Sequence, residues 1–358
     1  MICGVETYDV IVIGAGQSGL AAARALRETG ADPVVLEASD QPGGSWPRYY
    51  DSLTLFSPAR YSALPGLPFG GDPDRYPRRD DVTAYLREYA ARLGADIRTG
   101  SRVTAVTADG AAYTVRLADG TELGARAVIA ATGSFSRPYR PALAGLGQYA
   151  GTLIHASEYR QPGPFAGRHV IVVGAGNSAV QIAAELAGDA ASVTLATRKA
   201  VRYAPQRPLG RDLHFWFKIT GIDTLPAGRW ISRPPTVPVF DDGRYRAAIA
   251  AGRPVCRPVF TAVNGTTVTW PGGDTSHADA IVLATGYRPA LDYLAPLGAL
   301  GPGGYPLHRG GLSATCPGLA YVGLEWQRSL SSASLRGVGR DARYVAGRLS
   351  ALRGARRR

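Results

Sequence analysis

Cysteine is scarce in this 358-residue sequence, and its three copies lie far apart. They are Cys3, Cys256 and Cys316, and no two of them form a Cys-x-x-Cys pair. This spacing argues against a redox-active dithiol, and with only five histidines the sequence offers no ligand pattern for zinc or iron. We therefore expect no metal. The low cysteine content also fits a reducing cytoplasm, where we expect the protein to reside.

Long hydrophobic runs are also missing. No uninterrupted apolar stretch reaches the roughly 18 residues that a membrane span requires. The residues before Tyr8 contain no basic region typical of a secretory signal, so we expect neither secretion nor a membrane partner. No Gly-x-Ser-x-Gly sequence occurs, which leaves a hydrolase without support.

The charge is unbalanced without being clustered. The formal net charge is +12, and the basic residues are almost all arginines spread along the chain. We therefore expect no nucleic-acid partner, although a pI near 9.8 would permit one. A hydrophobic content of 45% with 19% charged residues is typical of a globular protein, and the length suits two domains.

A glycine-rich signature occurs twice. Residues 14–19 read GAGQSG and residues 174–179 read GAGNSA, and each follows an apolar run and precedes a helical sequence. A strand, a glycine turn and a helix N-terminus together bind a dinucleotide pyrophosphate, because backbone N–H groups and the helix dipole face its charge. Two copies predict two dinucleotides on one polypeptide, with electrons passing between them.

The copies differ after their second strands. Glu37 ends this strand in the first copy, where a carboxylate accepts hydrogen bonds from ribose hydroxyls and repels a 2′-phosphate, which suits FAD. The second copy has Arg198 and Lys199 at the corresponding place, and cationic donors suit the 2′-phosphate of NADPH. We expect NADPH rather than NADH, with a simple solvent-exposed arginine as the alternative for Arg198.

A second repeat supports two related domains, because Ala-Thr-Gly ends an apolar strand at 131–133 and again at 284–286. We predict an α/β fold with two Rossmann-like, three-layer ββα dinucleotide-binding domains, the NADPH domain being inserted in the FAD domain. The expected boundaries are 1–163 for the first part of the FAD domain, 164–289 for the NADPH domain with an irregular insertion at about 203–253, and 290–358 for the C-terminal part of the FAD domain. A final helix is expected to start near Gly339.

The segment between the two signatures resembles a family motif. Residues 149–159 read YAGTLIHASEY, similar to the Phe-x-Gly-x-x-x-His-x-x-x-(Phe/Tyr/Trp) motif of class B flavin-containing monooxygenases, with Tyr149 in place of Phe. Residues 43–46 (GGSW) and 284–287 (ATGY) are also similar to family features. The resemblance spans nearly the whole chain and is nearest to the short bacterial branch close to arsenic-resistance-type flavin monooxygenases and the plant YUCCA enzymes.

The resemblance implies FAD and NADP as cofactors, with O₂ and a small molecule as substrates, and a homodimer by analogy. NADPH would reduce FAD, and a C4a-(hydro)peroxyflavin would oxygenate a soft nucleophile (N, S or As) or a carbonyl. Arg160, directly after the motif, favours heteroatom oxygenation over Baeyer–Villiger chemistry. The family often has Asn in the loop 54–59, and this chain has none there, so Ser57 is the best polar group, with loop capping as its alternative.

The resemblance also implies the site residues. We expect His155 to couple the domains and orient NADP⁺, with a purely structural role as the alternative, and Gln327 to lie in the flavin pocket. The expected catalytic residues are therefore His155, Ser57 and Gln327. The expected cofactor-binding residues are Gly14, Gly16, Gln17, Ser18, Gly19, Glu37, Ala38, Gly44, Trp46, Val103, Thr132, Gly133, Gly174, Gly176, Asn177, Ser178, Arg198, Lys199, Thr285 and Gly286.

Two rival functions remain at this point. One is an NADPH oxidase or electron-transfer reductase that releases H₂O₂, which the missing loop Asn favours. The other is a flavin- or nucleotide-sensing module without catalysis, which degenerate signatures would have favoured.

Overall fold

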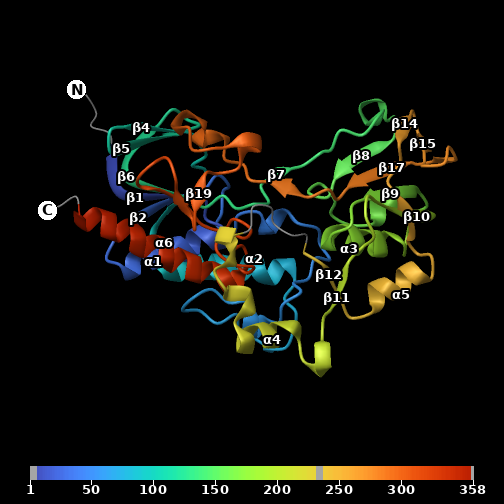
Figure 1. Cartoon of the computed structure of the whole chain (residues 1–358), viewed down its shortest axis with the longest axis horizontal. Coiled ribbons are helices and arrows are strands. Elements are labelled where there is room, and N and C mark those ends of the chain that lie inside the picture. Colours follow the sequence, from blue (N-terminus) through green and yellow to red (C-terminus); the bar gives the residue numbers. More distant parts are fainter. Residues whose placement is uncertain (1–5, 231–236, 356–358) are drawn as a thin grey trace.

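The computed structural model describes residues 6–230 and 237–355, so Cys3 lies outside the described residues. The chain forms a mixed α/β fold with two Rossmann-type units, each built on its own sheet (Figure 1). The expected fold class is thus confirmed. Among the described residues, no helix is long and apolar enough to cross a bilayer.

The first sheet has the strand order β19-β20-β21-β6-β1-β2-β3, with β4 and β5 attached to β6. Its central strands are parallel, and Val10 of β1 lies between Ala127 of β6 and Pro33 of β2. Because both faces of this sheet are covered, the buried part of β1 is an unbroken apolar run rather than an alternating one. The strands are β1 (Glu6–Ile13), β2 (Pro33–Leu36), β3 (Asp96–Arg98), β4 (Val103–Asp109), β5 (Ala112–Leu117), β6 (Glu122–Ala130), β19 (His308–Arg309), β20 (Leu312–Ser313) and β21 (Leu319–Tyr321).

Three layers make up this unit. Helices α1 (Gln17–Glu28), α2 (Arg79–Leu93) and α6 (Leu335–Ala355) cover one face of the sheet, and the hairpin of β4 and β5 covers the other. The core on the helical face is rich in alanine, and the small side chains of α1 let it pack closely against α6. Figure 1 shows these two helices side by side. The C-terminal part of the chain therefore returns to the N-terminal unit.

The second sheet has the order β13-β10-β9-β17-β8 and is parallel throughout. Its strands are β8 (Thr152–His155), β9 (His169–Val173), β10 (Ser192–Thr197), β13 (Val255–Pro258) and β17 (Ala280–Leu283). Helix α3 (Asn177–Leu186) packs on one face. An antiparallel flap of β14 (Ala262–Asn264), β15 (Thr267–Thr269) and β16 (Thr275–His277) packs on the other. Strand β8 belongs to this sheet although it precedes residue 164, where the second domain is expected to begin.

Two short ribbons and two helices complete the fold. Strand β7 (Arg137–Pro138) pairs with β18 (Tyr287–Arg288) where the chain passes between the units. Strand β11 (Tyr203–Pro205) pairs with β12 (Val239–Asp241), and this ribbon begins the segment 203–253, which includes α4 (Leu213–Thr220) and α5 (Arg244–Ala250). In Figure 1, α4 lies below α2 of the first unit, although the segment that contains it connects β10 and β13 of the second unit.

The final helix, α6, begins at Leu335, a turn earlier than the expected start near Gly339. The reason is a cap at Ser334. Its Oγ accepts a hydrogen bond from Gly337 N at 3.2 Å, and its carbonyl oxygen accepts one from Val338 N at 3.0 Å. A serine that satisfies the first free N–H groups starts a helix even when glycines follow it.

Candidate cofactor and active site

The first glycine turn follows β1. Gly14 has φ +102°, and its N–H donates to Leu36 O at 2.7 Å, so the turn is closed against β2. A Cβ at Gly19 would lie only 1.7 Å from Gly14 O. Only glycine at position 19 lets α1 approach the strand this closely, which aims the N-terminus of α1 at the turn.

Glu37 lies beside this turn and is 6% exposed. Its carboxylate accepts hydrogen bonds from Ala15 N at 2.7 Å and from Ser39 N at 2.9 Å and Oγ at 2.6 Å. A carboxylate accepts about four hydrogen bonds, so Glu37 keeps capacity for a further donor such as a ribose hydroxyl. The side chain is therefore held in place before any ligand arrives.

A third glycine segment closes over the first turn. Gly44 has φ +61°, and a Cβ there would lie 2.9 Å from Gly16 Cα. Trp46 Nε1 donates to Gln17 Oε1 at 3.0 Å, and Gln17 Nε2 donates to Ala333 O at 2.5 Å, just before α6. The Gln17 amide thus joins the turn at 43–46 to the C-terminal part of the chain. The exposed glycine backbone of these turns and the remaining acceptor capacity of the Glu37 carboxylate fit FAD.

The second glycine turn has the same design. Gly174 has φ +148°, and a Cβ there would lie 2.3 Å from Ala284 O, whereas a Cβ at Gly176 would meet nothing within 4 Å. The backbone at Gly176 is therefore open to a ligand. The Asn177 amide accepts from Phe240 N and donates to Pro238 O, both at 3.2 Å, so it also holds the segment next to β12.

Arg198 and Lys199 follow β10 and are exposed. Neither forms an ion pair with another described residue. Two cations at the end of the second strand, without an acidic neighbour in the motif, fit the 2′-phosphate of NADPH. Ser178 is half-buried at the start of α3.

His155 is completely buried at the end of β8. Ser157 N donates to Nδ1 at 3.1 Å, so Nε2 carries the proton and donates to Gly286 O at 3.1 Å. Burial lowers the pKa of His155, which keeps the ring neutral. Both nitrogens are occupied, so the ring fastens the linker to the second Ala-Thr-Gly turn and has no free nitrogen for proton transfer.

The two Ala-Thr-Gly turns follow β6 and β17. Gly133 and Gly286 have φ +74° and +84°, and a Cβ at either would meet nothing within 4 Å. Thr285 Oγ1 donates to Tyr139 O at 2.5 Å, and Thr132 Oγ1 lies 3.5 Å from Ala290 O. Each threonine thus bonds to the connection beyond the other turn, which couples the two turns. Ala38 directly follows Glu37, and Val103 begins β4 and packs against the core on the hairpin face of the first sheet.

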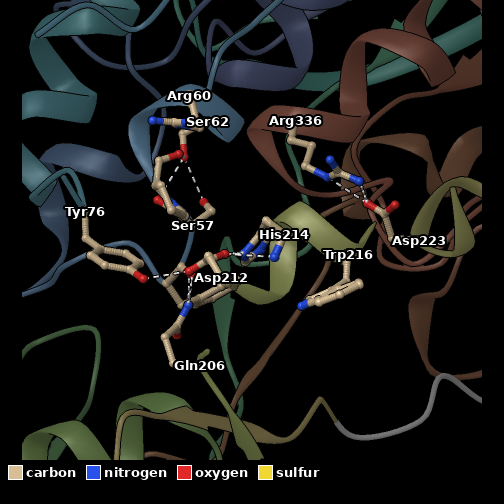
Figure 2. A network of polar contacts seen from close by, with 12 residues as sticks. Ser57, Arg60, Ser62, Tyr76, Gln206, Asp212, His214, Trp216, Asp223 and Arg336 are labelled. Atoms are coloured by element: carbon tan, nitrogen blue, oxygen red, sulfur yellow. Dashed lines mark hydrogen bonds and ion pairs between the residues drawn. The ribbon is translucent and has the colours of Figure 1, made fainter. Parts of the chain in front are cut away.

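Ser57 and Gln327 lie in tight local networks. Ser62 Oγ donates to Pro58 O at 2.9 Å, and Ser57 Oγ in turn donates to Ser62 Oγ at 2.8 Å (Figure 2). Ser57 therefore caps its own loop. Gln327 is 2% exposed, and its Oε1 lies 3.4 Å from the donor Leu324 N. Its Nε2 has no hydrogen-bond partner within the described part of the chain and is a free donor.

Sequence reasoning missed a polar network that joins the segment 203–253 to the first unit (Figure 2). Asp212 caps α4 through His214 N at 2.8 Å and accepts from His214 Nδ1 at 2.9 Å. Its other oxygen accepts from Tyr76 OH at 2.6 Å and Gln206 Nε2 at 2.8 Å. Burial alone would raise the pKa of Asp212, but these hydrogen bonds together outweigh burial and lower it.

A second bridge connects η6 (Ile222–Thr224) with α6. Asp223, 1% exposed, forms an ion pair with the guanidinium of Arg336, and Ser331 Oγ donates to Asp223 O at 2.9 Å. In Figure 2 this pair lies apart from the Asp212 network, on the other side of His214. The one signal in the sequence that could have pointed to this region is Asp212, a typical N-cap residue in front of an apolar run.

Comparisons with known proteins agree with this geometry. Residues 11–217 match the family described as pyridine nucleotide-disulphide oxidoreductase. An uncharacterized oxidoreductase, CzcO-like, from Geobacillus kaustophilus is 31% identical over 341 residues, covering 94% of this chain and 97% of the relative. Indole-3-pyruvate monooxygenase YUCCA1 from Oryza sativa subsp. japonica is 34% identical, covering 79% of this chain and 78% of the relative.

Among solved structures, a flavin-containing monooxygenase from Stenotrophomonas maltophilia is 32% identical, covers 97% of this chain and 99% of its own, and superposes with a TM-score of 0.85. These matches place the chain in the class of FAD- and NADP(H)-binding oxidoreductases. Within that class, it belongs to the class B flavin-containing monooxygenase family, as the motif at 149–159 predicts. The expectation of an NADPH-dependent flavin monooxygenase is thereby confirmed.

Proposed function

We propose that this chain uses NADPH, FAD and O₂ to oxygenate a small substrate at a soft N, S or As atom or at a carbonyl carbon. The observation that carries the proposal is that the fold has two glycine turns of the dinucleotide-binding type, and that Thr132 and Thr285 couple the Ala-Thr-Gly turns of the two units. No Cys-x-x-Cys pair occurs in the sequence, so electrons from NADPH would have no dithiol to reach. Oxygen is then the natural acceptor.

The chain's own residues bind and position the cofactors. The turn at 14–19, Glu37 and the segment 43–46 would hold FAD, and the turn at 174–179 with Arg198 and Lys199 would hold NADPH. Bound FAD supplies the chemistry of oxygen activation. His155 would keep the second Ala-Thr-Gly turn in register with the linker, and Gln327 Nε2 would offer a hydrogen bond to the flavin. The expected division into FAD and NADPH domains, a cytoplasmic location and a homodimer remain part of this proposal.

The two substrate chemistries have different support. Relatives named indole-3-pyruvate monooxygenases support a carbonyl substrate. Arg160 after the linker motif supports a heteroatom substrate, through the resemblance described above. A substrate panel with both kinds of compound is therefore the right test.

The test supplies purified holoenzyme with NADPH, ¹⁸O₂ and one candidate at a time: methyl phenyl sulfide, trimethylamine, phenylarsonous acid and indole-3-pyruvate. We expect one class to yield a product that carries a single ¹⁸O atom, formed in proportion to the NADPH consumed. NADPH consumption with equimolar H₂O₂ and no labelled product from any compound would contradict the proposal.

An NADPH oxidase is the second candidate, and one observation favours it. The Ser57 hydroxyl donates to Ser62 and caps its own loop, so it offers no proton to a flavin-bound group. The substitution Ser57→Asn separates the two functions. If oxygenation depends on a loop donor, S57N lowers the H₂O₂ released per NADPH; if the chain is an oxidase, that ratio does not change.

A further inference from the structure

Arg160, directly after the linker motif at 149–159, carries an unsatisfied donor. The residue is half-buried, and its Nη1 is fully buried without a hydrogen-bond partner in the part of the chain that the structure describes. An unpaired donor on a buried cation is costly, so such groups normally face an acceptor that the protein itself does not supply. No motif residue discussed above uses this guanidinium.

The surroundings of Arg160 come from three separate segments. Its carbonyl oxygen accepts from Asp51 N at 2.9 Å, which ties it to the chain just after the flavin turn at 43–46. Its positive charge also acts on the phenol of Tyr287, which follows Gly286. Tyr287 packs edge-on against His155, with ring centroids 5.0 Å apart. The backbone of Arg160 therefore joins the linker to the segment after the turn at 43–46, and its guanidinium lies near the second Ala-Thr-Gly turn.

The acids around Arg160 are already engaged by other groups. Glu158 pairs with Arg140 at 2.7 Å, and Asp51 pairs with Arg79. Glu185 accepts a hydrogen bond from the Tyr159 hydroxyl at 2.9 Å. Among the described residues no acid forms an ion pair with Arg160, and a planar guanidinium is best matched by a phosphate or carboxylate.

We propose that Arg160 binds an oxyanion of a molecule held between the two units. Two sources present this chemistry there: the diphosphate of NADP⁺, and a carboxylate on the substrate. The second source rests on the proposed function, whereas the first requires only that NADP⁺ binds. In either case Arg160 is a binding residue that contacts the ligand directly.

The test compares Arg160→Gln and Arg160→Lys with wild-type holoenzyme and with Arg140→Gln as a matched control. Arg140→Gln removes the same charge from the same neighbourhood, but its side chain is 43% exposed and paired. Binding is measured on the oxidised enzyme from changes in flavin absorbance, with NADP⁺ as one probe. The other probes, titrated with NADP⁺ present, are (phenylthio)acetate and its neutral analogue methyl phenyl sulfide. FAD content and melting temperature confirm that each variant is folded.

We expect Arg160→Gln to raise the Kd of one oxyanion probe roughly ten- to a hundredfold, the worth of one charge-assisted hydrogen bond. Arg160→Lys should raise this Kd less. The Kd values of Arg140→Gln for all probes, and those of every variant for the neutral sulfide, should stay within about twofold of wild type. Weaker NADP⁺ binding assigns the cofactor diphosphate, and weaker (phenylthio)acetate binding alone assigns a substrate carboxylate.

The inference would be overturned if folded, FAD-loaded Arg160→Gln bound NADP⁺ and (phenylthio)acetate with the same Kd values as wild type. It would also be overturned if wild type bound no (phenylthio)acetate and Arg160→Gln bound NADP⁺ as wild type does. If Arg160→Gln does not load FAD, Arg160→Lys decides by the same titrations. None of these measurements needs oxygen transfer, so a failed monooxygenase assay leaves this result readable on its own.

Discussion

At the scale of single residues, the fit between glycines and neighbouring backbone decides whether each cofactor turn forms. A Cβ at Gly19 would collide with Gly14 O at 1.7 Å, so Gly19→Ala must separate α1 from β1. We expect G19A to lose FAD and about 1–3 kcal/mol of unfolding free energy. Gly163→Ala is the control, because a Cβ there meets nothing within 4 Å. Urea denaturation and flavin absorbance measure both; full FAD content in G19A would contradict this account of the turn.

Arg198 and Lys199 should set the preference for NADPH. Replacing both with Gln removes the cations proposed to meet the 2′-phosphate, at a cost of about 1.5–3 kcal/mol of binding for a charge-assisted contact. The KM for NADPH should therefore rise roughly tenfold or more, while the KM for NADH stays nearly unchanged. Steady-state oxidation of the two nucleotides at matched pH gives the comparison, and a parallel rise in both KM values would show that these cations do not read the phosphate.

His155 should make stability depend on pH in a defined direction. Its pKa is below the usual 6.5 because of burial, so in the folded state the ring resists protonation that the unfolded chain accepts. The contribution of the neutral His155 ring to the unfolding free energy is fully present above pH 6.5. It is lost as the pH falls below 6.5, because the unfolded chain then binds a proton that the folded state does not. We expect the unfolding free energy of His155→Gln to fall less steeply with acid than that of wild type. Urea midpoints across this range test the prediction, which equal slopes would refute.

At the scale of elements, the sequence predicted the parts whose signals are local. The glycine turns and the apolar strands follow from periodicity and turn chemistry within a few residues. The start of α6 differs from the expected position near Gly339 because Ser334 caps the helix ahead of the glycines at 337 and 339. The segment 203–253 was predicted only as an irregular insertion, because its contacts are remote in sequence: Tyr76 and Asp212 are 136 residues apart, and Arg336 and Asp223 are 113 apart.

The bridge between η6 and α6 should be the stronger of the restraints on that segment. Removing Arg336 leaves the Asp223 carboxylate buried without its counter-charge, and such losses typically cost about 3–5 kcal/mol. We expect Arg336→Met to lower the urea midpoint strongly. Arg126→Met is the control, since Arg126 is 61% exposed in its pair with Asp9, where about 0–1 kcal/mol is typical. Equal midpoints for the two variants would show that the bridge adds no stability.

At the scale of the whole molecule, two dinucleotide units act together only because the chain crosses between them repeatedly. The ribbon of β7 and β18 carries it across, Thr132 and Thr285 each bond to the connection beyond the other turn, and the segment 203–253 reaches back to the first unit. The double glycine signature made this architecture predictable. The substrate-facing contacts were not predictable, because they depend on how loops of one unit meet loops of the other.

The central claim is that the electrons delivered from NADPH end in an oxygenated substrate. The most direct test reduces the FAD-loaded enzyme anaerobically with NADPH, mixes it with O₂ in a stopped-flow spectrometer and follows the flavin absorbance. We predict a transient species, distinct from both reduced and oxidised flavin, that persists for seconds with NADP⁺ bound. It should decay faster when a substrate that the enzyme can oxygenate is present. Direct return to oxidised flavin with stoichiometric H₂O₂, with and without each substrate of the panel, would contradict the account.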